Sequence, residues 1–272
     1  MEPYSVLMSV YGREKPVFLK ESLESVFAQS VFPDDVVLVC DGLLTEELDR
    51  VIAFFSERYP AVLQVKRLKE NRGLGIALNF GLGFCRHSLV ARMDSDDIAP
   101  LDRMEHQLAA FREEGLALAG GAVYEFENDI SCVRSVKKMP LTQEEILRYA
   151  QSRNPFNHPT VMFRKEVILA VGGYRHMPLH EDYDLWVRVI SSGAKVKNLE
   201  KNLCFMRVSD GMYERRGGMN YFKKAFFFRR ELYRSGFTGP IRFLYSTAGL
   251  FLVCLVPPGV RKSIYRILLR KK

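Results

Sequence analysis

The chain has 272 residues, 47% hydrophobic and 26% charged, which is the composition of an ordinary folded protein with one large domain, or one domain plus an appendage. Its five scattered cysteines include no C-x-x-C pair, which argues against a disulfide framework and a zinc site and favours reduced thiols in the cytoplasm. The net charge of +8 comes from residues 195–272, which hold 18 Lys/Arg against 4 Asp/Glu, so only this part is expected to attract a polyanion, either nucleic acid or an anionic membrane.

In the first hundred residues, segments with the hydrophobic pattern of a strand alternate with segments that have the pattern of a helix. The N-terminus lacks the basic and apolar regions of a signal peptide, so we do not expect export. Apolar runs predict strands, and amphipathic patterns between them predict helices. The expected strands are 5–10, 36–40, 63–68 and 88–93, and the expected helices are one that begins at Pro16, 45–59 and 75–85. Regular alternation of this kind predicts βαβ units and an α/β fold with a largely parallel sheet.

The alternation breaks after residue 100. A helix is expected over 102–113, followed by strands over 117–126 and 133–138. Thr142 to Glu145 has the pattern of a capping box and predicts a helix that runs towards Ser152. A proline-containing loop over 154–163 feeds a further strand, and 181–191 is expected to be helical. Because no linker or repeat interrupts this region, one domain to about residue 210 is the simplest interpretation.

The last sixty residues differ in composition. Residues 219–234 are crowded with aromatic and basic side chains, and 243–256 is an uncharged run of 14 residues. As a helix this run is about 21 Å long, shorter than the roughly 30 Å hydrocarbon core, so it is not expected to span a membrane. Residues 261–272 place Ile264, Ile267 and Leu268 on one face of a basic helix, which is typical of a helix lying on a membrane surface.

Three carboxylates, Asp94, Asp96 and Asp97, follow the expected strand 88–93. Buried unpaired carboxylates are costly, so they are expected at the carboxyl end of the strand, where open α/β sheets place ligands. Hard oxygen ligands this close together suit Mg²⁺ or Mn²⁺. The alternative is a polar turn that caps the next helix.

Five segments in order now resemble the inverting glycosyltransferases of family 2, which have the GT-A fold. They are SVLMSVYG (5–12), VCDG (39–42), NRGLGIALN (71–79), ARMDSDD (91–97), and GGY (172–174) ahead of EDYDLW (181–186). The resemblance covers residues 4 to about 216. Residues 212–218 resemble, more weakly, the branch that builds bacterial surface polysaccharides.

The resemblance implies a nucleotide-sugar donor, a divalent metal and a single displacement at the anomeric carbon. For the metal, Mn²⁺ or Mg²⁺, it implies Asp96 as the direct ligand, with Asp94. It implies Asp182 as the catalytic base. The implied donor-binding residues are Tyr11, Gly12, Asp41, Asn71, Arg72, Asp94 and Ser95, and the implied acceptor-binding residues are Glu181, Trp186 and His158.

Several of these residues have ordinary alternative roles. Asp41 can be the turn residue of an Asp-Gly pair, and Asp182 a first-turn acid of a helix. Trp186 can pack in a core, and His158 can be a structural loop residue. Arg72 can be a solvated arginine. Three further arginines, Arg207, Arg215 and Arg216, can bind a diphosphate or lie on the charged surface.

We therefore expect a catalytic domain over 1–216, with its nucleotide-binding half over about 1–100 and its acceptor half over about 101–216, and a membrane-associating helical region over 217–272. The expected acceptor is a glycan or lipid-linked glycan, reached from the cytoplasmic face of the membrane. A sugar-phosphate nucleotidyltransferase is the alternative enzyme, but residues 12–16 are poorer in glycine than its phosphate loop. A nucleic-acid-binding protein is disfavoured, because the basic region lacks a recognised motif.

Overall fold

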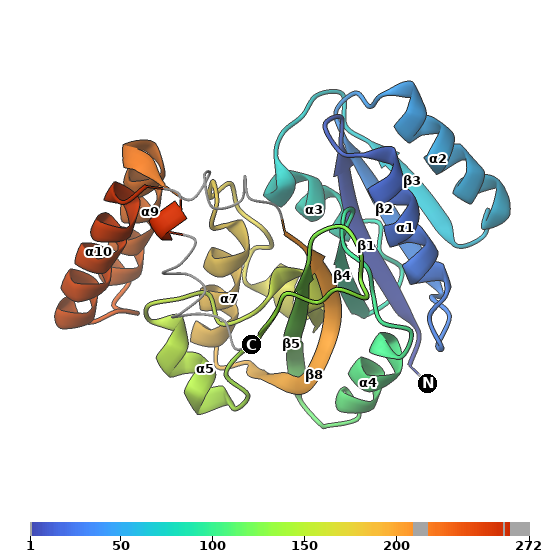
Figure 1. The fold of residues 1–272 in the computed structure, drawn as a ribbon. Helices are drawn as coiled ribbons and strands as arrows, with labels where there is room; N and C mark the ends of the chain where they lie inside the picture. Colours follow the sequence, from blue (N-terminus) through green and yellow to red (C-terminus); the bar gives the residue numbers. More distant parts are fainter. Residues whose placement is uncertain (1, 209–216, 258, 262–272) are drawn as a thin grey trace.

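The computed structural model describes residues 2–208, 217–257 and 259–261, and one mixed sheet forms its centre (Figure 1). The strands are β1 (Tyr4–Tyr11), β2 (Asp35–Asp41), β3 (Leu63–Arg67), β4 (Leu89–Asp94), β5 (Leu116–Phe126), β6 (Ser135–Lys137), β7 (Met162–Arg164) and β8 (Lys195–Arg207). Their order is β3-β2-β1-β4-β7-β5-β6, with β8 beside β5. The first four strands are parallel to one another, as the alternating pattern predicts.

Helices cover both faces of this sheet. They are α1 (Pro16–Phe27), α2 (Glu46–Arg58), α3 (Leu74–Leu82), α4 (Arg103–Ala110), α5 (Gln143–Ala150), α6 (Lys165–Ala170), α7 (Glu181–Ser191), α9 (Gly218–Arg234) and α10 (Pro240–Leu255), with a 3-10 turn η1 (His158–Thr160). Along β1, Val6 and Met8 belong to the core under α1, α2 and α4, whereas Leu7 belongs to the core under α3 and α7. Alternate side chains of a strand face opposite sides, so a strand that is apolar throughout must be covered twice.

Local signals explain several helix starts. Pro16 occupies the first turn of α1, where its missing N–H costs nothing. Thr142 and Glu145 form the capping box predicted for α5. Thr45 caps α2 by accepting a hydrogen bond from the backbone N–H of Leu48.

Strand β8 and helix α6 were not predicted from the sequence. β8 lies parallel to β5 over nearly its whole length, with register shifts near Gly121 and Ala122. Charged and polar residues interrupt its apolar positions, so it lacks the strict alternation that marks a strand. β8 pairs with β5, and β5 pairs with β7, so the sheet continues across the boundary expected near residue 100. The division into a nucleotide-binding half and an acceptor half therefore stays a prediction about function.

α9 and α10 form a hairpin at one side of the molecule, beside α7 and away from α1 and α2 (Figure 1). Phe228 and Leu232 of α9 pack against Tyr183 and Val187 of α7, which attaches the hairpin to the domain. Within the described part of the chain, no helix combines the length and the apolar content required to cross a membrane. The amphipathic segment expected over 261–272 lies almost wholly outside the described residues.

Candidate active site

Three predicted site residues meet where β1, β2 and β4 end. Tyr11 of β1 lies opposite Asp41 of β2, and Ser9 of β1 lies opposite Asp94 of β4. The chain proceeds from β1 to β2 on one side and places β4 on the other, so this edge is a topological switch point of the sheet. Ligands of open α/β sheets bind at such points, beyond the carboxyl ends of the strands.

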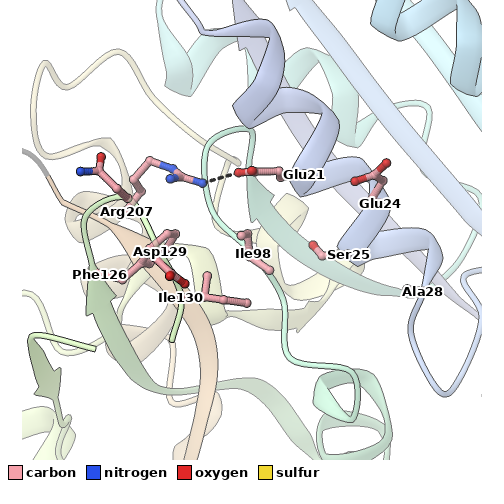
Figure 2. A pocket seen from close by; sticks show the side chains of 10 residues that line it. Glu21, Glu24, Ser25, Ala28, Ile98, Phe126, Asp129, Ile130 and Arg207 are labelled. Carbon is pink, nitrogen blue, oxygen red and sulfur yellow. Dashed lines mark hydrogen bonds and ion pairs between the residues drawn. The ribbon is translucent and has the colours of Figure 1, made fainter. Parts of the chain in front are cut away.

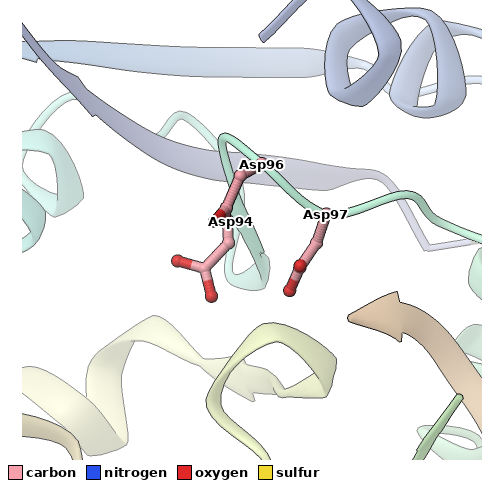
Figure 3. Close-up of side chains that lie close together, drawn as sticks. All are labelled: Asp94, Asp96 and Asp97. Carbon is pink, nitrogen blue, oxygen red and sulfur yellow. The ribbon is translucent and has the colours of Figure 1, made fainter. Parts of the chain in front are cut away.

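The acidic cluster forms here. Carboxylate oxygens of Asp94, Asp96 and Asp97 all lie within 4.8 Å of one another. The carboxyl groups of Asp94 and Asp97 point to the same side of the loop that follows β4 (Figure 3). Asp94 and Asp96 are half-buried, whereas Asp97 is buried and accepts a hydrogen bond of 2.7 Å from the backbone N–H of Arg207. Asp97 therefore braces the loop against β8.

Burial and neighbouring acids raise the pKa of these carboxyl groups. The pKa of Asp96 rises to about 7, because the group is desolvated and lies near Asp94 and Glu14. Burial is also the main cause of the raised pKa of Asp97. A cation would relieve this repulsion, and closely spaced carboxylate oxygens are the donor set that Mg²⁺ and Mn²⁺ prefer. The residues present fit such an ion, with Asp94 and Asp96 as the accessible ligands.

Asp41 is buried and holds the loop that precedes α3. Its two carboxylate oxygens accept hydrogen bonds from the backbone N–H groups of Arg72 and Gly73, at 2.7 and 2.9 Å. The Asn71 side chain donates to the backbone carbonyl of Asp41 at 3.2 Å. These bonds use two of about four lone pairs of the carboxylate, so a further acceptor position remains for a ligand. The side chains of Asn71 and Arg72 are exposed beside it.

The backbone conformation at position 42 requires glycine. Its φ angle is 87°, and a Cβ atom there would lie 2.6 Å from the backbone nitrogen of Asn71. Only glycine allows this approach at a left-handed angle. Asp41 and Gly42 therefore form a turn, and this turn places Asp41 beside the loop of residues 71–73.

Two more carboxylates lie on the first turn of α7. Both oxygens of Asp182 accept hydrogen bonds, one from the backbone N–H of Tyr183 at 2.7 Å and one from the Asn154 side chain at 2.6 Å. Burial raises the pKa of Asp182, and burial together with Asp182 raises the pKa of Glu181 to about 7. The charge of Asp94 also raises the pKa of Glu181, so the start of α7 is coupled electrostatically to the acidic cluster.

Trp186 does not contribute a surface to this site. Its side chain is 0% exposed and packs edge-on against Phe156, His158 and Tyr174. The prediction that Trp186 contacts an acceptor is therefore not supported by its position, because α7 turns it into the core while Glu181 and Asp182 lie at the helix start. The core-packing alternative describes it correctly.

His158 lies beneath the site. Its Nε2 atom is 3.0 Å from the Tyr174 hydroxyl, and burial together with the charge of Arg92 lowers its pKa well below the usual value. His158 is thus a neutral, hydrogen-bonded group at neutral pH. This position favours support of the Tyr174 loop, and contact with an acceptor remains a prediction.

Gly12 lies in the loop between β1 and α1, and Ser95 contacts the same loop. The Ser95 hydroxyl donates to the Glu14 carboxylate at 3.1 Å, which joins the acidic loop to that segment. A Cβ atom at Gly12 would lie 2.6 Å from the backbone oxygen of Leu43, so the ends of β1 and β2 approach closely there. Their contact with a donor stays a prediction.

Arg207 fixes the acidic loop from the opposite side. Its guanidinium donates to the backbone carbonyl of Asp96 at 3.0 Å and to the Glu21 carboxylate at 2.6 Å. It also lies over the rings of Phe18 and Phe126. With these partners Arg207 is a brace, which does not support the diphosphate contact considered for it. Arg215 and Arg216 lie outside the described residues.

The Glu21–Arg207 ion pair borders a hollow of about 660 Å³ between α1 and the end of β5 (Figure 2). Its other lining residues include Glu24, Ile98 and Asp129. None of Asp94, Asp96 and Asp182 lines this hollow. It lies beside the acidic loop but is distinct from the candidate active site.

Two residues that the sequence analysis did not single out belong to the site. Arg92 donates to Asp94 from within β4, and Asn154 donates to Asp182. Arg92 could have been recognised from the sequence, because it is a charged residue inside the apolar run 88–93 and a buried arginine requires a partner. Asn154 gave no such signal, since it is one polar residue in a loop.

The comparisons with known proteins agree with this geometry. Residues 5–172 match the sequence model of the family "Glycosyl transferase family 2". The chain is 37% identical over 271 residues to the Escherichia coli protein named UDP-Gal:alpha-D-GlcNAc-diphosphoundecaprenol beta-1,3-galactosyltransferase, covering 98% of this chain and 97% of that protein. It is 38% identical over 267 residues to the amylovoran biosynthesis glycosyltransferase AmsE of Erwinia amylovora, covering 96% and 97%.

Solved structures of other proteins have the same fold. The mannosyltransferase PcManGT from Pyrobaculum calidifontis, solved with GDP-Man and Mn²⁺, aligns with a TM-score of 0.67 at 17% identity, covering 98% of this chain and 76% of that one. This likeness shows the GT-A fold that the sequence predicts. The nucleotidyltransferase alternative is not favoured by any of these relatives. The chain therefore belongs to glycosyl transferase family 2 and is a glycosyltransferase.

Proposed function

We propose that the enzyme transfers a sugar, with inversion, from a UDP-sugar to a saccharide carried on a lipid diphosphate. The observation that carries the proposal is the cluster of Asp94, Asp96 and Asp97 at the end of β4, whose Asp94 charge also acts on Glu181 at the start of α7. The galactosyltransferase name of the E. coli relative supports galactose as the donor sugar and a GlcNAc-diphosphate lipid as the acceptor.

On the donor side, the ends of β1, β2 and β4 supply the binding groups. Asp41 has lone pairs free to accept from the N–H of a nucleobase, and Tyr11 borders the same strand ends. Backbone N–H groups at the start of α3, behind Asn71 and Arg72, suit phosphate or ribose oxygens. A divalent cation held by Asp94 and Asp96 would neutralise charge on the departing diphosphate.

On the acceptor side, Asp182 takes the proton of the attacking hydroxyl. The acceptor oxygen then forms a bond to the anomeric carbon while the bond from that carbon to the diphosphate oxygen breaks, and UDP leaves with the electron pair. Asn154 and the backbone N–H of Tyr183 hold the Asp182 carboxylate in one orientation, yet each oxygen keeps a lone pair for the proton. Attack opposite the leaving group inverts the configuration.

A transfer assay tests this function directly. Purified enzyme, Mn²⁺ and a panel of UDP- and GDP-sugars are incubated with a synthetic GlcNAc-diphosphate lipid. We expect a disaccharide-lipid product with UDP-galactose and release of one UDP per sugar transferred. A product of unchanged anomeric configuration, or formation of a nucleotide-sugar from a sugar phosphate, would contradict the proposal.

We also propose that the α9–α10 hairpin binds an anionic membrane at its cytoplasmic face, rather than nucleic acid. The exposed large apolar side chains of α10 are Ile241, Leu244, Tyr245, Phe251, Leu252 and Leu255, spaced so that they follow one side of the helix. Residues 218–261 hold seven Lys/Arg and one Glu. An apolar stripe with basic neighbours is the composition of a helix that lies in the headgroup region. Because α9 packs on α7, this attachment would hold Asp182 near a lipid-linked acceptor.

Binding to lipid vesicles tests the proposed attachment of the α9–α10 hairpin to a membrane. The double variant Leu244→Glu/Leu252→Glu is expected to lose binding to phosphatidylglycerol vesicles by at least about tenfold, because two charges enter the apolar layer. Leu169→Glu, at an exposed leucine of α6, is the control and should bind like the native enzyme. Unchanged sedimentation of the double variant with vesicles, or retention of the native enzyme on duplex DNA at the same salt concentration, would refute the membrane role.

A further inference from the structure

Arg92 is a fully buried cation directly beneath the acidic cluster. It lies on β4 two residues before Asp94, so both side chains face the same side of the sheet. Its side chain is 1% exposed, and Nη2 donates to the Asp94 carboxylate. In the described part of the chain, its Nε and Nη1 atoms are buried and find no hydrogen-bond acceptor.

The charge of Arg92 reaches both halves of the site. It acts electrostatically on Asp94, Asp96 and Asp97 at the end of β4. It also acts on Glu181 and Asp182 at the start of α7. The buried groups Tyr174 and His158 lie within the same field. The charge of one guanidinium therefore acts on the acids assigned to the donor and on those assigned to the acceptor.

Such an arrangement is costly for the fold. A buried guanidinium loses its hydration, and each donor without a partner costs further free energy. Replacing buried ion pairs by apolar residues often leaves stability unchanged or raises it. Packing alone thus gives no reason for Arg92, whereas orientation of a metal-binding carboxylate does. Partners of metal ligands are known to fix the orientation of those ligands and to tune affinity.

We infer that Arg92 is a positioning residue, which fixes the Asp94 carboxylate for a divalent cation. The inference rests on the proposed function, since it assumes a cation at Asp94 and Asp96. The Arg92 side chain is buried, so we assign it no contact with a substrate. Its effect passes through Asp94.

Arg103 provides a matched comparison within the chain. It is also fully buried, but its donors are satisfied by the Gln107 side chain, the Met93 sulfur and the backbone oxygen of Arg92. It donates to no acid of the cluster. A lysine at position 103 therefore disturbs the core to a similar extent without releasing Asp94.

The test measures Mn²⁺ binding by calorimetry, without donor or acceptor, for the native enzyme and for Arg92→Lys, Arg92→Gln and Arg103→Lys. Both Arg92 variants are expected to bind Mn²⁺ about 10- to 100-fold more weakly, as is usual when a partner of a metal ligand is changed. Arg103→Lys should stay within about twofold of the native enzyme. In transfer assays, raising the Mn²⁺ concentration should recover much of the lost rate of Arg92→Lys, which no general loss of folding would allow.

The outcomes are separable. If the native enzyme binds no Mn²⁺, the proposed cation site and this inference both fail. If the native enzyme binds Mn²⁺ and both Arg92 variants bind it equally well, only the inference fails. Equal weakening by Arg103→Lys would show that core disturbance is the cause, and would also overturn it. Should Arg92→Gln not fold, Arg92→Lys alone decides, because it keeps a cation in the same place.

Discussion

Changing Asp182 to asparagine is expected to lower kcat for sugar transfer by about 10³-fold, the middle of the range for loss of a general base. Asparagine keeps the size of the side chain and still accepts from Tyr183 N–H, but it cannot take a proton from the acceptor hydroxyl. The donor KM and the thermal stability should change little, because the substitution leaves the strand ends of the donor side intact. Steady-state kinetics with UDP-sugar and lipid acceptor provide the measurement.

The matched control for this variant is Glu181→Gln on the same helical turn. Glu181 has a pKa of about 7, so part of it is already protonated at neutral pH. We expect its substitution to cost far less in kcat than that of Asp182. If Glu181→Gln abolishes transfer and Asp182→Asn does not, Glu181 is the base and the assignment is reversed. Since the base must be ionised, the native rate should rise with pH through its raised pKa.

Asp96→Asn is expected to weaken Mn²⁺ binding by about 100-fold or more and to remove most metal-dependent activity, since a ligand oxygen loses its charge. Calorimetry of the purified protein gives the affinity, and transfer assays over a Mn²⁺ series give the dependence of rate. Asp102→Asn is the control, because Asp102 is an exposed acid on the same loop that pairs with His106. An Asp96→Asn enzyme with native Mn²⁺ affinity would remove Asp96 from the metal site.

The pH dependence of Mn²⁺ binding follows from the same residue. The carboxyl group of Asp96 has a pKa of about 7 in the structure without metal, and a cation binds its ionised form. The affinity should therefore be highest above pH 7 and fall as the pH drops below it, with a proton released on binding. Titrations at several pH values in buffers of different ionisation enthalpy measure both effects.

The periodicity of the first hundred residues was sufficient to predict β1 to β4 and the helices between them. β1, β2 and β4 are largely apolar runs, and the helices α1 and α2 each bury one apolar face. β8 escaped prediction because long-range pairing with β5 decides its conformation, and its own pattern is irregular. α9 and α10 could be predicted as helical from composition, but their attachment to α7 through Phe228 could not.

The sequence by itself determined the family, the carboxylates at the ends of expected strands and the basic aromatic C-terminal region, because each of these is written in local residue type and spacing. Only the tertiary structure decided which neighbours those residues have. It placed Trp186 in the core, showed Asp97 and Arg207 to be braces of one loop, and brought Arg92 beneath Asp94 and Asn154 against Asp182. Such contacts join segments far apart in the chain or depend on burial, and both are set by packing of the whole sheet with its helices.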